Sequence, residues 1–388
     1  MPIINRVAAL SDEMTTWRRD FHENPELLFD VHRTAGIVAE KLKEFGCDEV
    51  VTGLGRTGVV AVIKGRKNGS GKVIGMRADM DALPIEEETD VPYKSKAPGK
   101  MHACGHDGHT TMLLGAAKYL AETRNFDGTA IMIFQPAEEG GGGAKVMCDD
   151  GLMTRFGIQE VYGMHNMPGI PVGHFAIRPG PIMAAADRFT VNIEGKGGHG
   201  ANPHMTVDTL LVATQVVNAL QSIVSRNVDP LDSAVCSVTA IKAGEAFNVI
   251  PQHARLIGTV RTLKEATRDL LEKRFTEIVN GVVTAMGAKC EIKYERGYPV
   301  TDNHEAQTRT AVEVARAIAG DSQVNAEVMP QMGAEDFSYM MLERPGAYIF
   351  VGNGDTFGCH HPSYNFDDEA APLGASYWAK LAETTMPA

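Results

Sequence analysis

The 388-residue sequence is poor in several features that mark particular classes of protein. It has 37 lysines and arginines against 49 aspartates and glutamates, a net charge of −12, and this shortage of cations argues against a nucleic-acid partner. No uncharged apolar run approaches the length of a membrane span, so we expect no membrane partner. The first residues lack a basic segment followed by an apolar core, and we expect no signal peptide.

Cysteine is also scarce. The six cysteines, at positions 47, 104, 148, 236, 290 and 359, show no spacing typical of a disulfide framework. We therefore expect reduced thiols and a cytoplasmic location. The chain is 44% hydrophobic and 22% charged, as in ordinary globular proteins, and its length predicts one large domain and a smaller one.

Two kinds of segment organise the chain. Helical periodicity alternates with short apolar runs in both terminal parts, which predicts an α/β domain with a mainly parallel sheet flanked by helices. The helical segments are residues 3–23, 32–46 and 110–124, and the strands are residues 57–65, 72–80, 129–136, 160–165 and 346–352.

The middle of the chain has a different order, β-α-β-β-α-β, which is that of a ferredoxin-like α+β domain. We expect a main domain of residues 1–184 and 297–388, with an inserted domain of residues 185–296. The inserted elements are residues 187–195, 206–225, 232–244, 253–262, 265–286 and 288–297.

Reactive side chains gather at the ends of predicted strands of the main domain. The carboxyl ends of parallel strands share one edge of a sheet, so we expect these groups to converge. They are Asp79 and Asp81, Glu138 and Glu139, His165, the run Cys359-His360-His361, and the segment MHACGHDGHT at 101–110, which precedes a helix.

This set of groups indicates a metal site. Cys104 and His106 are two residues apart, which places both on one side of an extended loop. Thiolate, imidazole and carboxylate donors suit Zn²⁺, Mn²⁺, Co²⁺ or Ni²⁺ better than Mg²⁺ or Ca²⁺. In extended chain Glu138 and Glu139 point in opposite directions, so one can bind an ion while the other reaches an attacking water.

An alternative interpretation is a cysteine hydrolase in which Cys104 is the nucleophile and His106 or His109 the base. A nucleophile and its base usually meet across a fold rather than two residues apart. This interpretation also gives the glutamate pair and His165 no role. Each feature has an ordinary structural explanation when taken alone, but their joint position at strand ends favours the metal site.

The motifs resemble those of a known superfamily. RADMDALPI (77–85), MHACGHDGHT (101–110), FQPAEEGGGGAK (134–145), GMHNMP (163–168), GKGGHGANPH (195–204) and GAEDF (333–337) are similar to motifs of the metal-dependent amidohydrolases of the aminoacylase/carboxypeptidase superfamily. Within it the chain resembles the hippurate hydrolases and indole-3-acetyl-amino-acid hydrolases. The resemblance implies hydrolysis of N-acyl amino acids by one or two divalent ions, and a lid domain that also mediates dimerisation.

The resemblance also implies roles for individual residues. Glu138 corresponds to the general base, and the implied metal ligands are Cys104, His106, Glu139, His165 and His360. Pro362 sets the register in which His360 is the last ligand, while His361 replaces the usual asparagine or serine.

In the lid, His199 corresponds to a histidine that stabilises the tetrahedral intermediate. Asn248 and Arg261 correspond to residues that hold the substrate carboxylate. A homodimer or homotetramer formed through the lid is implied. Two alternatives stay open, a dipeptidase or carboxypeptidase of the same superfamily and a metal-binding protein without turnover.

Overall fold

The computed structural model describes residues 3–388, so the first two residues of the predicted main domain lie outside the described part. The chain forms two compact units. The first contains the chain up to residue 182 together with residues 302–329 and 336–388. The second contains residues 183–301 and 330–335.

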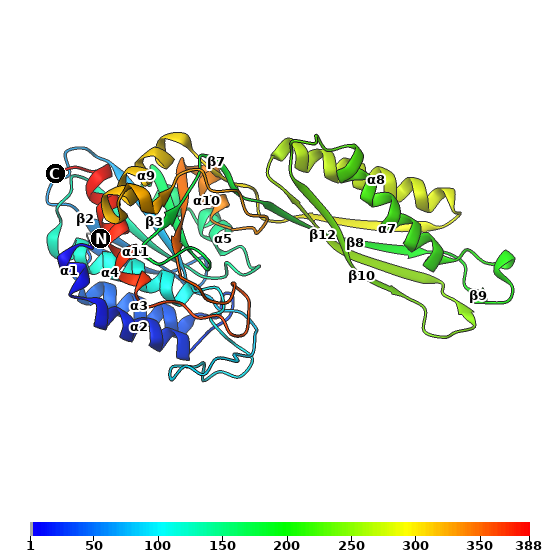
Figure 1. The fold of residues 1–388 in the computed structure, drawn as a ribbon, viewed down its shortest axis with the longest axis horizontal. Helices are drawn as coiled ribbons and strands as arrows, with labels where there is room; N and C mark the ends of the chain where they lie inside the picture. The colour runs from blue at the N-terminus through cyan, green and yellow to red at the C-terminus, as the bar shows by residue number, and fades with distance from the viewer. Residues whose placement is uncertain (1–2) are drawn as a thin grey trace. The chain divides into compact units, whose positions relative to one another are not determined.

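An eight-stranded sheet forms the centre of the first unit (Figure 1). Its strand order is β1 (Glu49–Leu54), β2 (Gly58–Lys64), β4 (Thr129–Gln135), β3 (Val73–Asp79), β5 (Glu160–Met167), β16 (Gly346–Gly352), β6 (Phe175–Ala176) and β15 (Val324–Asn325). Strands β4, β3, β5 and β16 run parallel to one another, whereas β1, β2 and β6 introduce antiparallel pairs. The predicted mainly parallel sheet is confirmed.

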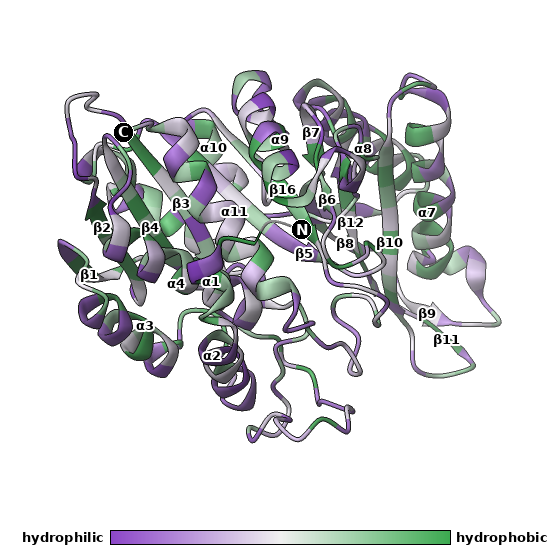
Figure 2. Ribbon diagram, turned by 60° about the vertical axis from the view of Figure 1, so that its left-hand side comes forward, coloured by the Kyte–Doolittle hydropathy of each residue, from purple (hydrophilic) through white to green (hydrophobic). Residues whose placement is uncertain are grey.

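Burial explains why the central strands read as continuous apolar runs. Every residue of β4 is buried, and Figure 2 colours this strand almost wholly hydrophobic. A parallel sheet covered on both faces has this pattern rather than an alternating one. The helices of this unit are α1 (Asn5–Ala8), α2 (Ser11–Glu23), α3 (His32–Glu44), α4 (His106–Thr123), α5 (Gly143–Asp149), α6 (Leu152–Arg155), α9 (Glu305–Ala319), α10 (Ser338–Glu343) and α11 (Ala370–Thr385).

The second unit has the element order β-α-β-β-α-β. Its antiparallel sheet has the order β10 (Ala234–Ala243), β12 (His253–Thr262), β8 (Ala185–Glu194) and β13 (Lys289–Arg296). Helices α7 (Thr209–Arg226) and α8 (Glu265–Ala285) cover one face of this sheet (Figure 1). Asp208 caps α7 by accepting hydrogen bonds from two backbone N–H groups, which begins the helix here.

Several small elements complete the chain. A two-stranded ribbon, β9 (Gly198–His199) with β11 (Val249–Ile250), was not predicted, because two-residue strands carry no periodic signal. The others are β7 (Gly180–Met183), β14 (Thr301–Asn303) and the 3₁₀ turns η1 (Pro203–Met205) and η2 (Asp321–Gln323). In the described part of the chain, no helix is both long and apolar enough to cross a membrane.

Candidate metal centre

The first unit carries its reactive groups at one edge of the large sheet. Strands β3, β4, β5 and β16 are parallel, so their carboxyl ends meet there. Asp79 is the last residue of β3, Glu138 and Glu139 follow β4, and His165 is near the end of β5. The topology therefore brings together segments that lie far apart in the sequence.

The Cys104–His106 segment differs from the predicted extended loop. Gly105 adopts φ 85°, and α4 begins at once with His106. A Cβ on Gly105 would lie 2.3 Å from the Asn166 Nδ2 atom, so glycine is required for the close approach as well as for the backbone conformation. Cys104 is thus presented by a loop and His106 by the first turn of a helix.

A tight turn presents the two glutamates. Ala137 has φ 55°, and the backbone N–H groups of Glu138 and Glu139 donate to the two Asp81 carboxylate oxygens at 2.9 and 3.1 Å. Gly143 completes the turn, because a Cβ there would lie 1.7 Å from the Pro136 carbonyl oxygen. Asp81 therefore fixes the backbone of both glutamates.

All five predicted ligands come together at this edge. The Cys104 Sγ and His165 Nε2 atoms are 3.4 Å apart, and the His360 Nε2 and Glu139 Oε1 atoms are 3.2 Å apart. Three overlapping groups each have their donor atoms within 4.8 Å of one another: Cys104, His106 and His165; Cys104, Glu139 and His360; and His106, Glu138 and Glu139.

These residues fit a divalent metal ion. A tetrahedral ion with metal–sulfur and metal–nitrogen bonds of normal length holds such donors about 3.6 Å apart, close to the Cys104–His165 distance. In the described chain, both ring nitrogens of buried His106 and the Glu139 Oε1 atom lack a hydrogen-bond partner of normal geometry. The Nδ1 atom of His165 donates to the Asn166 carbonyl, and its Nε2 atom is the ring nitrogen that lies beside the Cys104 thiol.

The electrostatics of the site also favour a cation. Burial disfavours the protonated form of His106. The carboxylates of Asp79 and Asp81 stabilise this form more strongly, and they raise the pKa of His106 to about 10. Burial likewise opposes ionisation of Glu139, and the His360 imidazole, 3.2 Å from its Oε1 atom, still lowers the pKa of this carboxyl. A divalent ion would meet the same demand for positive charge.

A second set of side chains supports the ligands. His109 donates from Nδ1 to Asp79 Oδ1 at 2.6 Å and accepts at Nε2 from the Asn166 N–H at 2.9 Å. Both ring nitrogens are therefore used, so His109 supports the site rather than binding metal. Asn166 also donates to the Cys104 carbonyl and accepts from the Tyr364 hydroxyl at 2.7 Å, which ties β5 to the ligand loop.

Beneath the ligands lies a buried ion-pair network. Arg77 donates to Asp79 at 2.7 Å, to Asp336 at 3.0 Å and to Gln135 at 2.8 Å. Asp336 also accepts from the Ala144 N–H, at the start of α5. The network joins the ends of β3 and β4 to the segment before α10 and so stiffens the edge that carries the site.

A further charged cluster lies behind the first turn of α4. His22 contacts Asp107 at 2.8 Å and Glu87 at 3.3 Å. Burial disfavours the protonated form of His22, but the hydrogen bond to Asp107 stabilises this form more strongly and raises the pKa of His22 to about 9.

A second thiol lies beside the ligand Cys104. The interaction with the Cys359 thiol and burial raise the pKa of Cys104 well above its usual value. A buried thiol of this kind is a poor nucleophile unless a metal removes its proton, which disfavours the cysteine-hydrolase alternative.

The three residues predicted in the lid all lie in the second unit. His199 is exposed on β9, where it faces Val249, and Asn248 lies beside it because the Asn248 carbonyl accepts from the Gly200 N–H at 2.8 Å. Arg261 is on β12 opposite Ala186, at the other end of the sheet. The structure brings His199 and Asn248 together but not Arg261.

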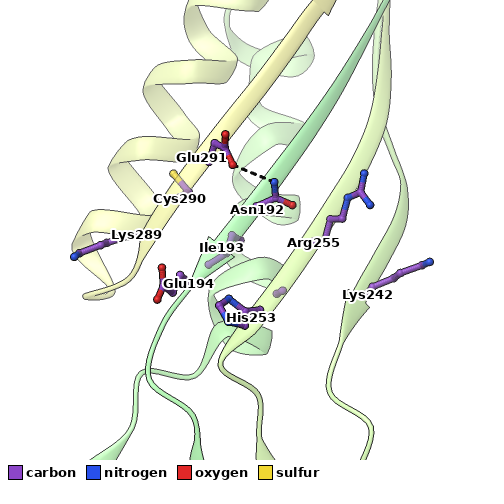
Figure 3. A pocket seen from close by; sticks show the side chains of 10 residues that line it. Asn192, Ile193, Glu194, Lys242, His253, Arg255, Lys289, Cys290 and Glu291 are labelled. Atoms are coloured by element: carbon purple, nitrogen blue, oxygen red, sulfur yellow. Dashed lines mark hydrogen bonds between the residues drawn. The ribbon is translucent and has the colours of Figure 1, made fainter.

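The open face of the second unit's sheet carries a shallow pocket of a different kind (Figure 3). Its walls include Lys242, His253, Arg255 and Lys289, and Asn192 donates to Glu291 at 3.4 Å. No predicted metal ligand lines this pocket.

Sequence reasoning missed most of the supporting residues. Asn166, Tyr364 and Asp336 received no role, although each lies in or next to a recognised motif. Polar residues adjacent to proposed ligands were the available signal, since ligands are commonly held by hydrogen-bonded neighbours.

Comparisons with known proteins agree with this geometry. A family model described as "Peptidase family M20/M25/M40" matches residues 75–384. The chain is 46% identical to the hippurate hydrolase of Campylobacter jejuni, over 98% of this chain and 99% of the relative. It is 39% identical to the N-acetylcysteine deacetylase of Bacillus subtilis, over 96% and 97%.

A solved structure has the same fold. The Bacillus subtilis YXEP protein, described as a dinuclear metal-binding peptidase of the M20 family, matches with a TM-score of 0.84 and 36% identity. The match covers 98% of this chain and 99% of the other.

Proposed function

Because the chain belongs to peptidase family M20/M25/M40, we propose that it is a metal-dependent amidohydrolase that cleaves N-acyl amino acids into a carboxylic acid and a free amino acid. The observation that carries the proposal is the convergence of five metal donors with Glu138 at one sheet edge. The names of relatives similar over nearly the whole chain, a hippurate hydrolase and an N-acetylcysteine deacetylase, support this substrate class.

The ligand roles are part of the proposal. Cys104, His106, Glu139, His165 and His360 would hold one or two ions of Zn²⁺, Mn²⁺, Co²⁺ or Ni²⁺. A bound ion supplies Lewis acidity toward the amide carbonyl and makes water more acidic. All six cysteines are free thiols, which supports a reducing compartment, the cytoplasm.

Glu138 would move the protons of the reaction. It lies within 4.8 Å of donor atoms of His106 and Glu139, and its backbone is fixed through Asp81. Its carboxylate takes a proton from the attacking water and returns it to the leaving nitrogen. The free amino acid can then depart as a neutral amine.

The second unit would complete the site from a partner subunit. Eight residues separate His253 from Arg261 along β12, about 26 Å of extended chain. His199 lies beyond the end of β12 that begins at His253. Glu194, the last residue of β8, pairs with His253, and the chain continues from Glu194 into β9, which carries His199. One small substrate cannot reach His199 and Arg261 of the same chain, so we infer a homodimer in which these two residues come from different subunits.

In this arrangement His199 would donate to the oxyanion, and Arg261 and Asn248 would hold the substrate carboxylate. Removal of an oxyanion donor in other hydrolases costs roughly 3 kcal/mol of transition-state stabilisation.

A complementation experiment tests whether His199 acts in the active site of the partner subunit. Glu138→Gln and His199→Ala should each be nearly inactive, whereas a purified mixed dimer should regain up to half of the wild-type activity. A purified mixed dimer without activity contradicts the proposal that His199 acts in the active site of the partner subunit.

The overall proposal is tested by metal removal and a substrate screen. Chelator should abolish hydrolysis, and one or more of the four metals should restore it. Acetyl, benzoyl, indole-acetyl and p-aminobenzoyl amino acids identify the acyl group, and dipeptides test the peptidase alternative. Full activity in a sample that elemental analysis finds free of metal contradicts the proposal.

A further inference from the structure

We propose that Tyr364 is a positioning residue for the metal centre, whose hydroxyl acts through the Asn166 side chain to hold the loop that carries Cys104. The inference rests on the proposed function in one respect, because it takes Cys104, His165 and His360 as metal ligands. It deepens that function by assigning the alignment of these ligands to a tyrosine that lies four residues after His360.

The first support is a hydrogen-bonded chain from the phenol to the backbone of a ligand. Tyr364 and Asn166 are fully buried, and the Tyr364 hydroxyl donates to Asn166 Oδ1 at 2.7 Å. Asn166 Nδ2 donates in turn to the Cys104 carbonyl at 2.6 Å. A carbonyl can only accept, so the Asn166 amide must present its nitrogen to Cys104 and its oxygen to a donor elsewhere. Tyr364 supplies that donor.

The backbone of Asn166 contacts a second ligand. Its carbonyl accepts from His165 Nδ1, and this hydrogen bond orients the imidazole ring. Its N–H donates to His109 Nε2 at 2.9 Å. A shift of Asn166 would therefore move the His165 ring as well as the Cys104 carbonyl.

Tyr364 also belongs to the loop of a third ligand. Its N–H donates to the His361 carbonyl at 2.9 Å, which closes a turn directly after His360. The His360 N–H donates to the Ala103 carbonyl at 2.7 Å. The loop is thus attached to the Cys104 segment at two points, by this backbone bond and by the Tyr364 hydroxyl through Asn166. Two attachments fix the relative rotation of two segments, whereas one fixes only their separation.

The hydroxyl is closely enclosed. A Cβ on Gly105 would lie 2.4 Å from the Tyr364 hydroxyl oxygen and 2.3 Å from Asn166 Nδ2. Asn353, just after β16, donates from Nδ2 to the same hydroxyl at 3.4 Å. Loss of the hydroxyl would take a donor from the buried Asn166 Oδ1 atom, and a buried acceptor that loses its partner favours rearrangement of the segments around it.

Tyr364→Phe tests this role because it removes only the hydroxyl. Loss of a partner that aligns a ligand lowers metal affinity by about 10–100-fold, and we expect a loss in this range. Titration of the metal-free, full-length protein with Zn²⁺ against a chromophoric chelator measures it. The visible absorption of the Co²⁺-loaded variant should also differ from that of wild type, since this spectrum reports coordination geometry.

Tyr162→Phe is the matched control. Tyr162 is also fully buried and lies on β5, and its hydroxyl donates to Glu160 Oε2 at 2.9 Å, at the start of that strand. Both variants lose one hydrogen bond of a buried phenol, so a merely structural role would affect metal binding in both alike. Tyr162→Phe should keep the Zn²⁺ affinity and the Co²⁺ spectrum of wild type. Circular dichroism verifies that both variants are folded.

A double-mutant cycle tests the route through Asn166. Asn166→Ala should weaken Zn²⁺ binding, and adding Tyr364→Phe should weaken it no further, because residues that act through one another are not additive. Losses that multiply in the double variant contradict this route.

The outcomes separate this inference from the proposed function. Wild-type Zn²⁺ affinity in Tyr364→Phe, or an equal loss in Tyr162→Phe, overturns the inference and leaves the function intact. A wild-type protein that binds no metal contradicts the proposed function. Hydrogen exchange of the metal-free proteins then still decides the inference, because residues 101–110 should exchange faster in Tyr364→Phe than in wild type and Tyr162→Phe. Equal exchange in all three overturns it.

Discussion

Arg77→Met should destabilise the first unit by several kcal/mol. The Arg77 side chain is fully buried and pairs with Asp79 at 2.7 Å and Asp336 at 3.0 Å, both also fully buried. Methionine fills much of the same volume but leaves two carboxylates without their cation. Breaking a buried ion pair from one side costs about 3–5 kcal/mol, a large share of a typical stability of about 5–15 kcal/mol.

Residual contacts set the size of the loss. Asp79 keeps its 2.6 Å hydrogen bond from His109, and Asp336 keeps that from the Ala144 N–H at 2.9 Å. We therefore expect the middle of the range, about 4 kcal/mol. Adding Asp336→Asn removes one of the stranded charges and should recover part of the loss, although Asp336→Asn alone should destabilise.

Urea unfolding followed by tryptophan fluorescence measures this change. The only two tryptophans, Trp17 and Trp378, are buried in the first unit, so the signal reports on that unit. Arg309→Met is the matched control, because its ion pair with Glu305 is exposed and worth about 0.5 kcal/mol or less. An Arg77→Met protein within about 1 kcal/mol of wild type would refute the reasoning.

Other expectations follow from the site. Glu138→Gln should lower turnover by about 10²–10⁴-fold with metal content retained, whereas Glu139→Gln should lose metal. If elemental analysis finds the reverse pattern, Glu138 is the ligand and Glu139 the base. His360→Ala should reduce metal content far more than His361→Ala, and the opposite ranking makes His361 the ligand. The raised pKa of His22 should contribute stability fully below pH about 6.5, and this contribution is lost as pH rises through about 9; His22→Gln should flatten the dependence of unfolding on pH in this window.

Periodicity predicted most of the fold because long elements bury one repeated face. Strand β12 and helix α8 lie within a residue of their predicted bounds, since each has an apolar pattern of constant period. The start of α4 was predicted four residues late. His106, Asp107 and His109 look unfavourable for a buried helix, and only the surrounding carboxylates and imidazoles make their burial tolerable.

The candidate site was predictable only in part. Its donors are rare residue types at strand ends, which the sequence displays directly. The hydrogen bonds of Asn166 to the Cys104 carbonyl and from the Tyr364 hydroxyl depend on the register of segments that meet only in the folded chain. Resemblance pointed to His199 and Arg261, but sequence could not reveal that β9 and the far end of β12 place them at opposite ends of one unit.

The spread of the donors along the chain has a consequence for synthesis on the ribosome. The first, Cys104, and the last, His360, stand on either side of the whole second unit, of which residues 183–301 are continuous. A nascent chain can therefore fold nearly all of its insertion while strand β16 and the His360 loop are still unmade. The protein can acquire its complete set of metal donors only after the whole insertion has been translated, so a product truncated before His360 would carry a folded insertion and an incomplete donor set.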